Sequence, residues 1–436
     1  MAATPVTPAR RAALDVSSAV RDGLRLDVAF GRVARSLESR DRAFAHELSF
    51  GVGRLRGRLD HLLHARVRGG LERLDAPVLD VLRLGAYQVL YMGSVPRYAA
   101  ISQSVEQAAE VAGRGAGGLV NAVLRAVAAT GDGAELFPAP ESDPVGYLSA
   151  WGSHPRWLVE RWLAQWSFVD VLALVQGNNR QPPLTLVPLE QSPTEAASRL
   201  MEIGIDARVV GEGTDCVRLL PGTDPAEALR HVRGLIQDPG ANLVSRYADP
   251  PEGTKIADLC AAPGGKALLS ARRASFIVAA DRSEVRMRRL RQNAVRTGTP
   301  LGLVVADGRR PPLRAMDVVT LDVPCTGTGT LRRHPDGRWR LRPATLTELV
   351  RVQHELIDGA ASLVAPGGLL VYSTCSLEPE ENHEQVAAFR DRNPDFRVEA
   401  TDAVPARYRD AEGHLVVRPW RTGFDGAFAA RLRRAS

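Results

Sequence analysis

Two cysteines and one aspartate stand at matching points in the last third of the chain. Asp322 and Cys325 follow an apolar run in VVTLDVPCTGTGTLRRHPDGRWR, and Cys375 follows another in LLVYSTCSLEPEEN. Such a pair of cysteines could form a disulfide, bind a metal, fill the core or act as a catalytic pair. The rest of the sequence has to decide among these four roles.

The composition argues against the first two roles. The 436 residues include four cysteines, with no CxxC pair and no cysteine–histidine cluster at zinc-finger spacing, so no metal site is expected. No apolar run approaches the roughly 20 residues that cross a bilayer. The N-terminal residues MAATPVTPARRAALDVSS lack the apolar stretch of a secretory signal. We therefore expect a cytoplasmic protein without a membrane segment, in which disulfides are rare.

Strands and helices alternate from about residue 236. The apolar runs TKIADLC, ASFIVAAD, LGLVVADG, MDVVTLDVPC and PGGLLVYSTCS are separated by turns and by helical patterns such as SEVRMRRLRQNAVRTG. This alternation predicts a parallel, doubly wound α/β sheet, in which ligands bind beyond the carboxyl ends of the strands. The groups that fall there are Asp281, Asp307, Asp322, Cys325, Cys375 and the APGG turn that follows Cys260.

The turn and two of the aspartates indicate a cofactor. CAAPGGKA is neither a GxGxxG fingerprint nor a P-loop, because Cys260 stands at the first glycine position and Ala267 replaces the Ser or Thr after the lysine. Asp281 ends the second strand, where a carboxylate can bind ribose hydroxyls, and Asp307 could accept a hydrogen bond from an adenine amino group. Either aspartate alone is more simply a cap or turn residue. Together they favour an adenosine cofactor without a required pyrophosphate site, S-adenosylmethionine.

Such a cofactor gives the cysteines a chemical role. Carbon 5 of cytosine accepts a methyl group only after a thiolate has added to carbon 6 and converted the ring into an enamine. Asp322 could hydrogen-bond the base edge and supply proton character to the ring nitrogen, and a second cysteine could assist proton removal at carbon 5 and release of the adduct. The target base must leave its stack to reach the site. The residues alone do not decide which cysteine attacks.

The first 235 residues have a different pattern. Residues 1–135 carry apolar positions at three- and four-residue spacing, which predicts an all-helical bundle. TGDGAELFPAPESDP, residues 130–144, is a linker by composition. Residues 145–235 mix helical and strand patterns, including a helix predicted at PAEALRHVRGLI, and are typical of a small α+β module.

The charge of the chain indicates a partner. The formal net charge is +6, and the lysines are Lys255 and Lys266, so almost all positive charge is arginine. Arginines cluster in RMRRLRQNAVR, LRRHPDGRWRLR and the C-terminal RLRR. Because arginine binds phosphate through two hydrogen bonds and stacks on bases, a nucleic-acid partner is plausible. The alternative is a composition that prefers arginine throughout the chain.

The motifs resemble those of a known family. DLCAAPGGK, DVPCTGTGTLRRHPDGRW and YSTCSLEPEEN resemble the motifs of RNA cytosine carbon-5 methyltransferases of the NOL/NOP/Sun family, and TGFDGAFAARLRR is similar to that family's C-terminal motif, which more often reads DGFF. The N-terminal helices resemble a NusB-type domain. This resemblance implies a multidomain enzyme with a NusB-like RNA-binding domain at 1–135, an RRM-like α+β module at 145–235 and a Rossmann-like methyltransferase domain at 236–436.

The resemblance also implies roles for single residues. Cys375 would be the nucleophile, Cys325 would aid product release, and Asp322 would lie between the cofactor and the target base. Asp281 would hold the ribose and Asp307 the adenine. The loop on the methionine side of the cofactor would consist of Cys260, Ala261, Ala262, Pro263, Gly264, Gly265 and Lys266.

The chain departs from the family pattern at a few positions. Val323 replaces a usual alanine and Thr326 a usual serine, and PPLTLVPLE lacks the Arg-Val-Asn that often follows the proline pair. The last departure leaves the RNA contacts of the middle module open.

The substrate has more than one candidate. The NusB-like domain favours 16S ribosomal RNA by analogy, whereas the motifs alone would equally serve transfer RNA. A third alternative is an inactive NusB-like RNA-binding scaffold, but the intact set of Asp322, Cys325 and Cys375 argues against it. We expect an RNA partner, no DNA partner and a monomer.

Overall fold

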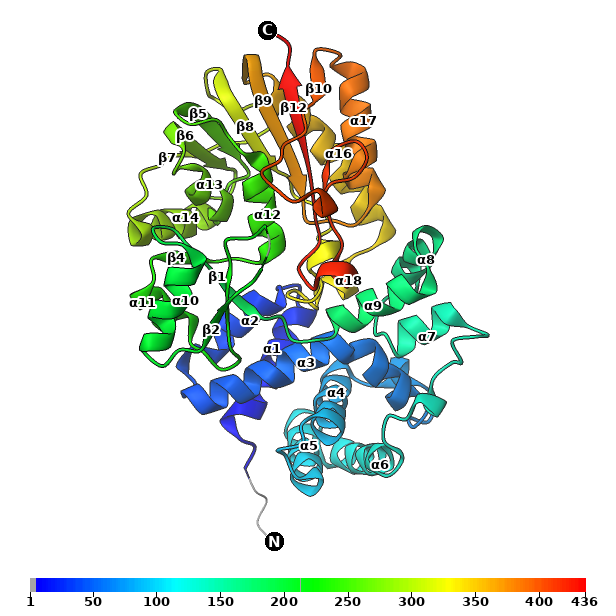
Figure 1. The fold of residues 1–436 in the computed structure, drawn as a ribbon. Helices are drawn as coiled ribbons and strands as arrows, with labels where there is room; N and C mark the ends of the chain where they lie inside the picture. Colours follow the sequence, from blue (N-terminus) through cyan, green and yellow to red (C-terminus); the bar gives the residue numbers. More distant parts are fainter. Residues whose placement is uncertain (1–4, 212) are drawn as a thin grey trace. The chain divides into compact units, whose positions relative to one another are not determined.

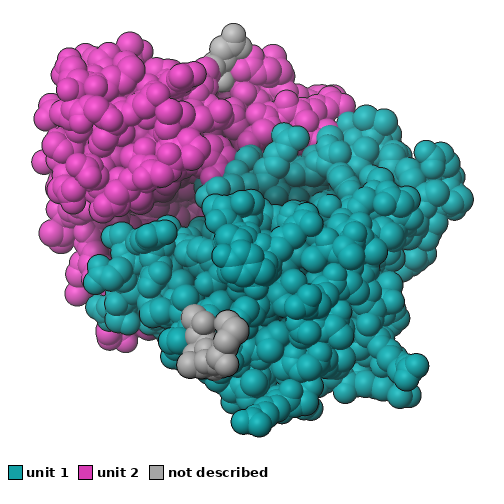
Figure 2. Space-filling model, turned by 90° about the horizontal axis from the view of Figure 1, so that it is seen from below, with its two compact units in different colours: residues 1–181, 331–340 teal, residues 182–330, 341–436 magenta. Residues whose placement is uncertain are grey.

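The computed structural model describes residues 5–211 and 213–436. The chain forms two compact units, one made of residues 1–181 and 331–340 and the other of residues 182–330 and 341–436 (Figures 1 and 2). The short segment 331–340 therefore leaves the second unit and returns to it. No helix among the described residues is both long and apolar enough to span a membrane.

The first unit is helical, as the apolar spacing predicts. Its largest core cluster gathers residues such as Leu48, Leu82 and Leu124, which are fully buried on three different helices. Glycine allows close packing there, because a Cβ atom on Gly51 would overlap the ring of Tyr87. The helices of this unit are α1 (Pro8–Arg21), α2 (Leu26–Val33), α3 (Ser39–His64), α4 (Ala76–Tyr91), α5 (Arg97–Ala112), α6 (Arg114–Thr130), α7 (Pro144–Ala150), α8 (Arg156–Gln165), α9 (Phe168–Asn178) and α15 (Gly337–Arg340).

The second unit begins with a small four-stranded antiparallel sheet of order β2-β3-β1-β4. Its elements are β1 (Leu184–Pro188), α10 (Pro193–Glu202), β2 (Ala207–Val209), β3 (Val217–Leu219), α11 (Pro225–His231) and β4 (Gly234–Ile236). The β-α-β-β-α-β order with this strand arrangement is ferredoxin-like. This fold agrees with the α+β fold predicted for the middle of the chain, whereas residues 145–181, which the sequence also assigned to that module, belong to the first unit.

One prediction in this module is wrong. The helix predicted at PAEALRHVRGLI ends at His231, and residues 234–236 pair with β1 instead. A Cβ atom at Gly234 would lie 2.7 Å from the backbone oxygen of Val187. Glycine therefore lets this segment approach β1 closely as a strand.

The larger sheet has the order β10-β12-β9-β8-β5-β6-β7, with β11 paired to β12. The pairs among β5 to β9 are parallel, as the strand–helix alternation predicts. The strands are β5 (Thr254–Leu259), β6 (Ala274–Asp281), β7 (Gly302–Val305), β8 (Met316–Asp322), β9 (Val364–Thr374), β10 (Phe396–Val398), β11 (Leu415–Val417) and β12 (Ala427–Arg434).

Helices cover both faces of this sheet (Figure 1). On one face Ala257 and Val278 pack with Ile357, and on the other Ile256 and Ile277 pack in a second cluster, because side chains alternate along a strand. The first cluster includes residues of α16 (Pro343–Ala361) and α17 (His383–Arg392), and the second includes residues of α12 (Pro239–Ala248), α13 (Gly265–Ser270) and α14 (Glu284–Thr297). The last helix is α18 (Pro419–Thr422).

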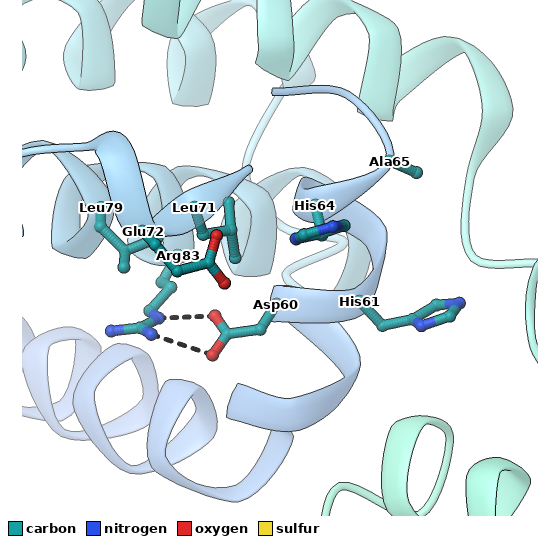
Figure 3. A pocket seen from close by; sticks show the side chains of 8 residues that line it. All are labelled: Asp60, His61, His64, Ala65, Leu71, Glu72, Leu79 and Arg83. Atoms are coloured by element: carbon teal, nitrogen blue, oxygen red, sulfur yellow. Dashed lines mark hydrogen bonds and ion pairs between the residues drawn. The ribbon is translucent and has the colours of Figure 1, made fainter. Parts of the chain in front are cut away.

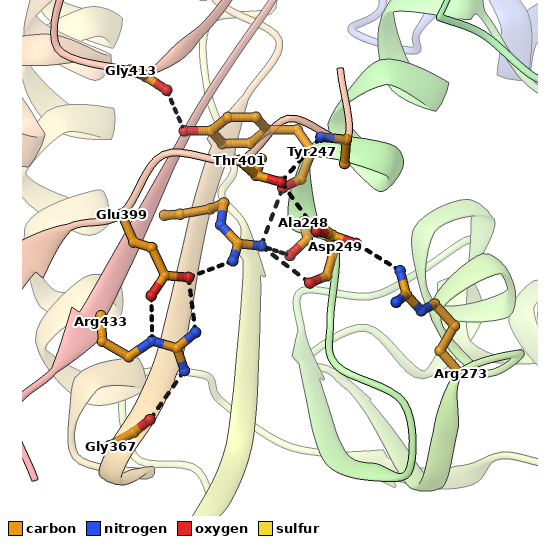
Figure 4. A network of polar contacts seen from close by, with 11 residues as sticks. Tyr247, Ala248, Asp249, Arg273, Gly367, Glu399, Thr401, Gly413 and Arg433 are labelled. Carbon is orange, nitrogen blue, oxygen red and sulfur yellow. Dashed lines mark hydrogen bonds and ion pairs between the residues drawn. The ribbon is translucent and has the colours of Figure 1, made fainter. Parts of the chain in front are cut away.

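The antiparallel strand β12 was not foreseen, because its RLRR sequence suggested a nucleic-acid contact. It lies between β9 and β10 and is antiparallel to both. Arg431 is 4% exposed and donates to the carbonyl oxygen of Ala248 and to Glu399, and Arg433 Nε lies 2.6 Å from Glu399 Oε2 (Figure 4). These two arginines therefore join β12 to α12 and to Glu399, which follows β10.

Candidate active site

The loop between β5 and α13 is tied to the end of β6. The amide of Ala261 donates to the Ala280 carbonyl at 2.9 Å, and the amide of Ala262 lies 3.3 Å from Asp281 Oδ2. Gly264 has a φ of +106°, and a Cβ atom there would lie 2.9 Å from Leu290 Cγ. The turn therefore requires glycine and presents bare backbone at the strand ends.

Several carboxylates face this loop. Burial first, and then the charges of Asp281, Asp258 and Asp322, raise the pKa of Cys260 to about 12. Cys260 is therefore a neutral thiol, which suits a loop residue and not a nucleophile. Asp258, at 2% exposure on β5, was not singled out from the sequence; burial and the neighbouring Asp322 raise its pKa to about 7.

Lys266 joins the loop to the next strand. Its Nζ lies 2.7 Å from Asp322 Oδ2, while Asp322 Oδ1 accepts a hydrogen bond from Ser373 Oγ at 3.0 Å. Burial opposes the charge of Lys266, but the interactions with Asp322, followed by those with Cys375 and Asp258, raise the pKa of Lys266 above its usual value. Lys266 is therefore a cation paired with Asp322, and its charge also interacts with Cys375.

The two cysteines lie side by side as free thiols. Their sulfur atoms are 3.3 Å apart. The hydrogen bond to Cys375, then burial, and then the charges of Cys375 and Glu381 raise the pKa of Cys325 well above its usual value. The environment thus favours the protonated form of Cys325, whereas Cys375 interacts with the charge of Lys266. This asymmetry was not visible in the sequence.

Glycines bring three motifs together around the thiols. The Gly329 amide donates to the Cys375 carbonyl at 3.0 Å, and the Gly426 amide donates to the Gly329 carbonyl at 2.8 Å. A Cβ atom on Gly329 would lie 2.8 Å from both the Cys375 oxygen and Gly426 Cα. The TGTG loop, the TCS loop and the FDG turn therefore meet backbone to backbone.

Asp307 differs from these groups in its exposure and in its hydrogen-bond partner. Its carboxylate is partly exposed and receives hydrogen bonds from the backbone amide and Nε of Arg309, each at 3.0 Å. These side-chain and backbone hydrogen bonds lower the pKa of Asp307 to about 2. It borders a hollow of about 640 Å³ that also touches Arg310, Glu355 and Ser362. The adenine contact assigned to Asp307 stays a prediction.

A second hollow, of about 490 Å³, lies in the helical unit (Figure 3). Its main charged groups already have partners, since Arg83 Nε and Nη2 bind Asp60, and His61 Nε2 lies 2.8 Å from the Leu136 carbonyl. No group of three or more potential metal ligands occurs among residues 5–211 and 213–436. No predicted site residue lies in this hollow.

Comparison with known proteins gives the family. The model described as "16S rRNA methyltransferase RsmB/F" matches residues 246–433, the NusB family model matches 7–129, and an RsmF/B-like ferredoxin-like model matches 154–224. A Mycobacterium tuberculosis protein, Rv1407, is 36% identical over 464 residues, covering 99% of this chain and 97% of its own. The chain belongs to the RsmB/F methyltransferase family. The family resemblance drawn from the motifs is thus confirmed.

Other members and solved structures agree with this placement. The ribosomal RNA small subunit methyltransferase B of Klebsiella pneumoniae is 33% identical over 405 residues, covering 89% of this chain and 91% of its own. The crystal structure of PH0851 matches with a TM-score of 0.80 and 23% identity, covering 99% of this chain and all of that one. A methyltransferase homologue from Pyrococcus horikoshii matches with a TM-score of 0.57 and 24% identity over 68% of this chain. These two structures share the fold of this RsmB/F family member.

Proposed function

We propose that this enzyme transfers a methyl group from S-adenosylmethionine to carbon 5 of a cytosine in 16S ribosomal RNA. The observation that supports this most is the contact of the two thiols at 3.3 Å beside the Lys266–Asp322 pair. Relatives named ribosomal RNA small subunit methyltransferase B support the choice of RNA.

The residues present suit the cofactor. The bare backbone at Gly264 leaves room beside the strand ends, and Asp281 retains acceptor capacity, since a carboxylate has about four acceptor positions. The charges of Asp281, Asp258 and Asp322 raise the pKa of Cys260 in the same loop against the opposing charge of Arg286, and nearby carboxylates favour a cation such as a sulfonium. When bound, S-adenosylmethionine supplies a methyl group on positively charged sulfur.

The protein's own groups prepare the attack. The Lys266 cation interacts with Cys375, and the two thiols lie within hydrogen-bond distance of each other. The Cys375 sulfur then bonds to carbon 6 of cytosine, and the electrons of the C5–C6 double bond move into an enamine. Carbon 5 of that enamine would form the new bond to the methyl carbon as the bond between this carbon and the sulfonium sulfur breaks. Asp322, held by Lys266 and Ser373, is oriented to bind the edge of the base.

The same arrangement of the two cysteines accounts for release of the methylated RNA from Cys375. Once Cys375 is a thioether, it no longer carries the charge and hydrogen bond that chiefly raise the pKa of Cys325. Cys325 can then lose its proton to solvent and take the proton from carbon 5. The electron pair of that C–H bond restores the ring double bond, and the bond between carbon 6 and Cys375 breaks.

Cysteine variants test the assignment. Cys375→Ala removes the attacking thiolate, so neither adduct nor methyl transfer should occur. Cys325→Ala should still attack but release slowly, and should accumulate a protein–RNA adduct on denaturing electrophoresis. The double variant should lose the adduct, because formation precedes release. An adduct with Cys375→Ala and none with Cys325→Ala would reverse the roles, and full methylation by both variants would exclude covalent catalysis.

The RNA requires its own experiment. Bisulfite sequencing of ribosomal and transfer RNA from a deletion strain should show loss of one methylated cytosine in 16S ribosomal RNA. Loss confined to transfer RNA would exclude the ribosomal substrate. Loss at neither RNA, with RNA binding intact, would instead support the inactive scaffold.

A further inference from the structure

A buried carboxylate lies behind the Cys325 loop. Glu381 is 0% exposed and ends the 3₁₀ turn η5 (Pro379–Glu381). Its Oε1 accepts hydrogen bonds from the Thr326 amide at 2.9 Å and from Gln353 Nε2 at 2.8 Å, and its Oε2 accepts one from the Thr326 hydroxyl. No ion pair joins it to any residue that the structure describes. Burying an unpaired carboxylate is costly, so a role other than packing is implied.

The neighbour of Glu381 extends this support to the other side of Cys325. Gln353 is fully buried on α16, and its Nε2 donates to the Pro324 carbonyl at 2.9 Å as well as to Glu381. The residues before and after Cys325 are thus both held by one pair of side chains. Their hydrogen bonds fix the backbone from which the thiol projects.

The same segment also reaches the second thiol. Ser376 Oγ lies 3.0 Å from the Thr326 hydroxyl, and Asn382 Nδ2 donates to the Ser376 carbonyl at 3.0 Å. On the other side of Cys375, the Thr374 hydroxyl donates to Asn382 Oδ1 at 2.6 Å. Glu381 and the residue after it therefore brace both cysteine loops at once.

We propose that Glu381 is a positioning residue that holds Cys325 against Cys375 and places an uncompensated negative charge beside its thiol. This inference rests on the proposed function. It explains why a glutamate and not a glutamine serves here: the charge favours the protonated form of the Cys325 thiol beside Cys375. In agreement, the charge of Glu381 contributes to the raised pKa of Cys325, after the hydrogen bond to Cys375, burial and the Cys375 charge.

The first experiment measures how the reactivity of the Cys325 thiol depends on pH. The titratable groups that face Cys325 are Cys375, Tyr372 and Glu381. In a full-length Cys375→Ser background, iodoacetamide alkylation of Cys325 is followed against pH by mass spectrometry. Adding Glu381→Gln should lower the midpoint by about one pH unit or more, since a nearby like charge shifts a titration by about 1–3 units. Glu384→Gln, which removes an exposed charge three residues away, should leave it unchanged.

The second experiment measures release. With Cys375 intact, Glu381→Gln should lower kcat with KM for RNA unchanged, because Cys325 is then less firmly held as the protonated partner of Cys375 during the attack. Thr326→Val, which removes the hydroxyl contacts with Glu381 and Ser376 and keeps the Glu381 charge, should slow release without lowering the alkylation midpoint. If Glu381→Gln does not fold, Thr326→Val still tests whether Glu381 positions Cys325.

The outcomes separate the two proposals. An unchanged midpoint in Glu381→Gln, or normal release in Thr326→Val, would overturn the role of Glu381. Absence of any adduct in Cys325→Ala would instead overturn the proposed function. The two failures can be told apart because the alkylation midpoint is measured without RNA or cofactor.

Discussion

The Asp281 carboxylate ends β6 with 3% of the residue exposed, and it holds the Ser283 amide at 2.9 Å. Asp281→Ala should weaken S-adenosylmethionine binding by about 1–3 kcal/mol, because it removes the proposed ribose acceptor and leaves buried amides unpaired. Titration calorimetry measures the loss. Asp307→Ala is the comparison; its carboxylate is exposed and held by Arg309, so its loss should be smaller. Unchanged affinity in Asp281→Ala would remove the cofactor assignment.

Among the elements, β12 depends on Glu399. The hydrogen bond from Arg433 outweighs the opposing effect of burial and, with that from Arg431, lowers the pKa of Glu399 to about 2. Because the folded pKa is depressed, this stabilisation is present above the unfolded value of about 4.3 and is lost as pH falls toward 2. Glu399→Gln should therefore reduce the unfolding free energy by about 1–3 kcal/mol at pH 7.

Urea unfolding at pH 7 and near pH 3 measures this effect. The difference in midpoint between the wild type and Glu399→Gln should shrink at the lower pH, where the wild-type carboxylate begins to protonate. Asp391→Asn, an exposed change on α17, should leave the midpoint unchanged at both. If the difference in urea midpoint does not depend on pH, the packing of the Glu399 side chain and not its charge stabilises β12.

The helix α14 supplies a different kind of prediction. Arg289 and Arg291 are exposed, and neither forms an ion pair within the described parts of the chain. Replacing both with Gln should weaken RNA binding and lower the slope of log affinity against log salt by about 2, one for each phosphate contact. Filter binding over a salt series measures this slope. If the slope is unchanged, the arginines of α14 reflect composition and not a contact with RNA.

These elements show what the sequence can predict. The ends of β6, β8 and β9 were predictable because a short apolar run followed by a polar residue is a local pattern. The strand β12 was not, since the charges of Arg431 are satisfied by Glu399 and Ala248, which are remote in sequence. Glu381 lay within a quoted motif, but only its burial against Thr326 gives it a role. The sequence alone does not show which distant residues will pair with a buried charged side chain.

At the scale of the whole molecule, the motif DVPCTGTGTLRRHPDGRW is divided between the two units. Cys325 belongs to the second unit, whereas residues 331–340 belong to the first. There Arg338 is fully buried and donates to the Ser153 carbonyl at 3.0 Å, and Trp339 Nε1 donates to the Gly53 carbonyl at 2.9 Å. The amide of Leu26 also donates to Asp336 at 3.2 Å. The N-terminal helices therefore hold part of the segment that follows the Cys325 loop.

This arrangement predicts two effects of deleting residues 1–130. RNA affinity should fall, with a smaller dependence on salt, if the helical domain contacts phosphates. In addition, the segment 331–340 loses Gly53 and Leu26 as partners, so trypsin should cleave after Arg338 much faster than in the full chain, where that side chain is buried. Peptide mass spectrometry of a timed digest measures the rate, with cleavage after Arg289 in α14 as the internal control. Equal protection of Arg338 in both chains would show that the segment folds without the N-terminal helices, and methylation lost on truncation would then be a matter of RNA binding alone.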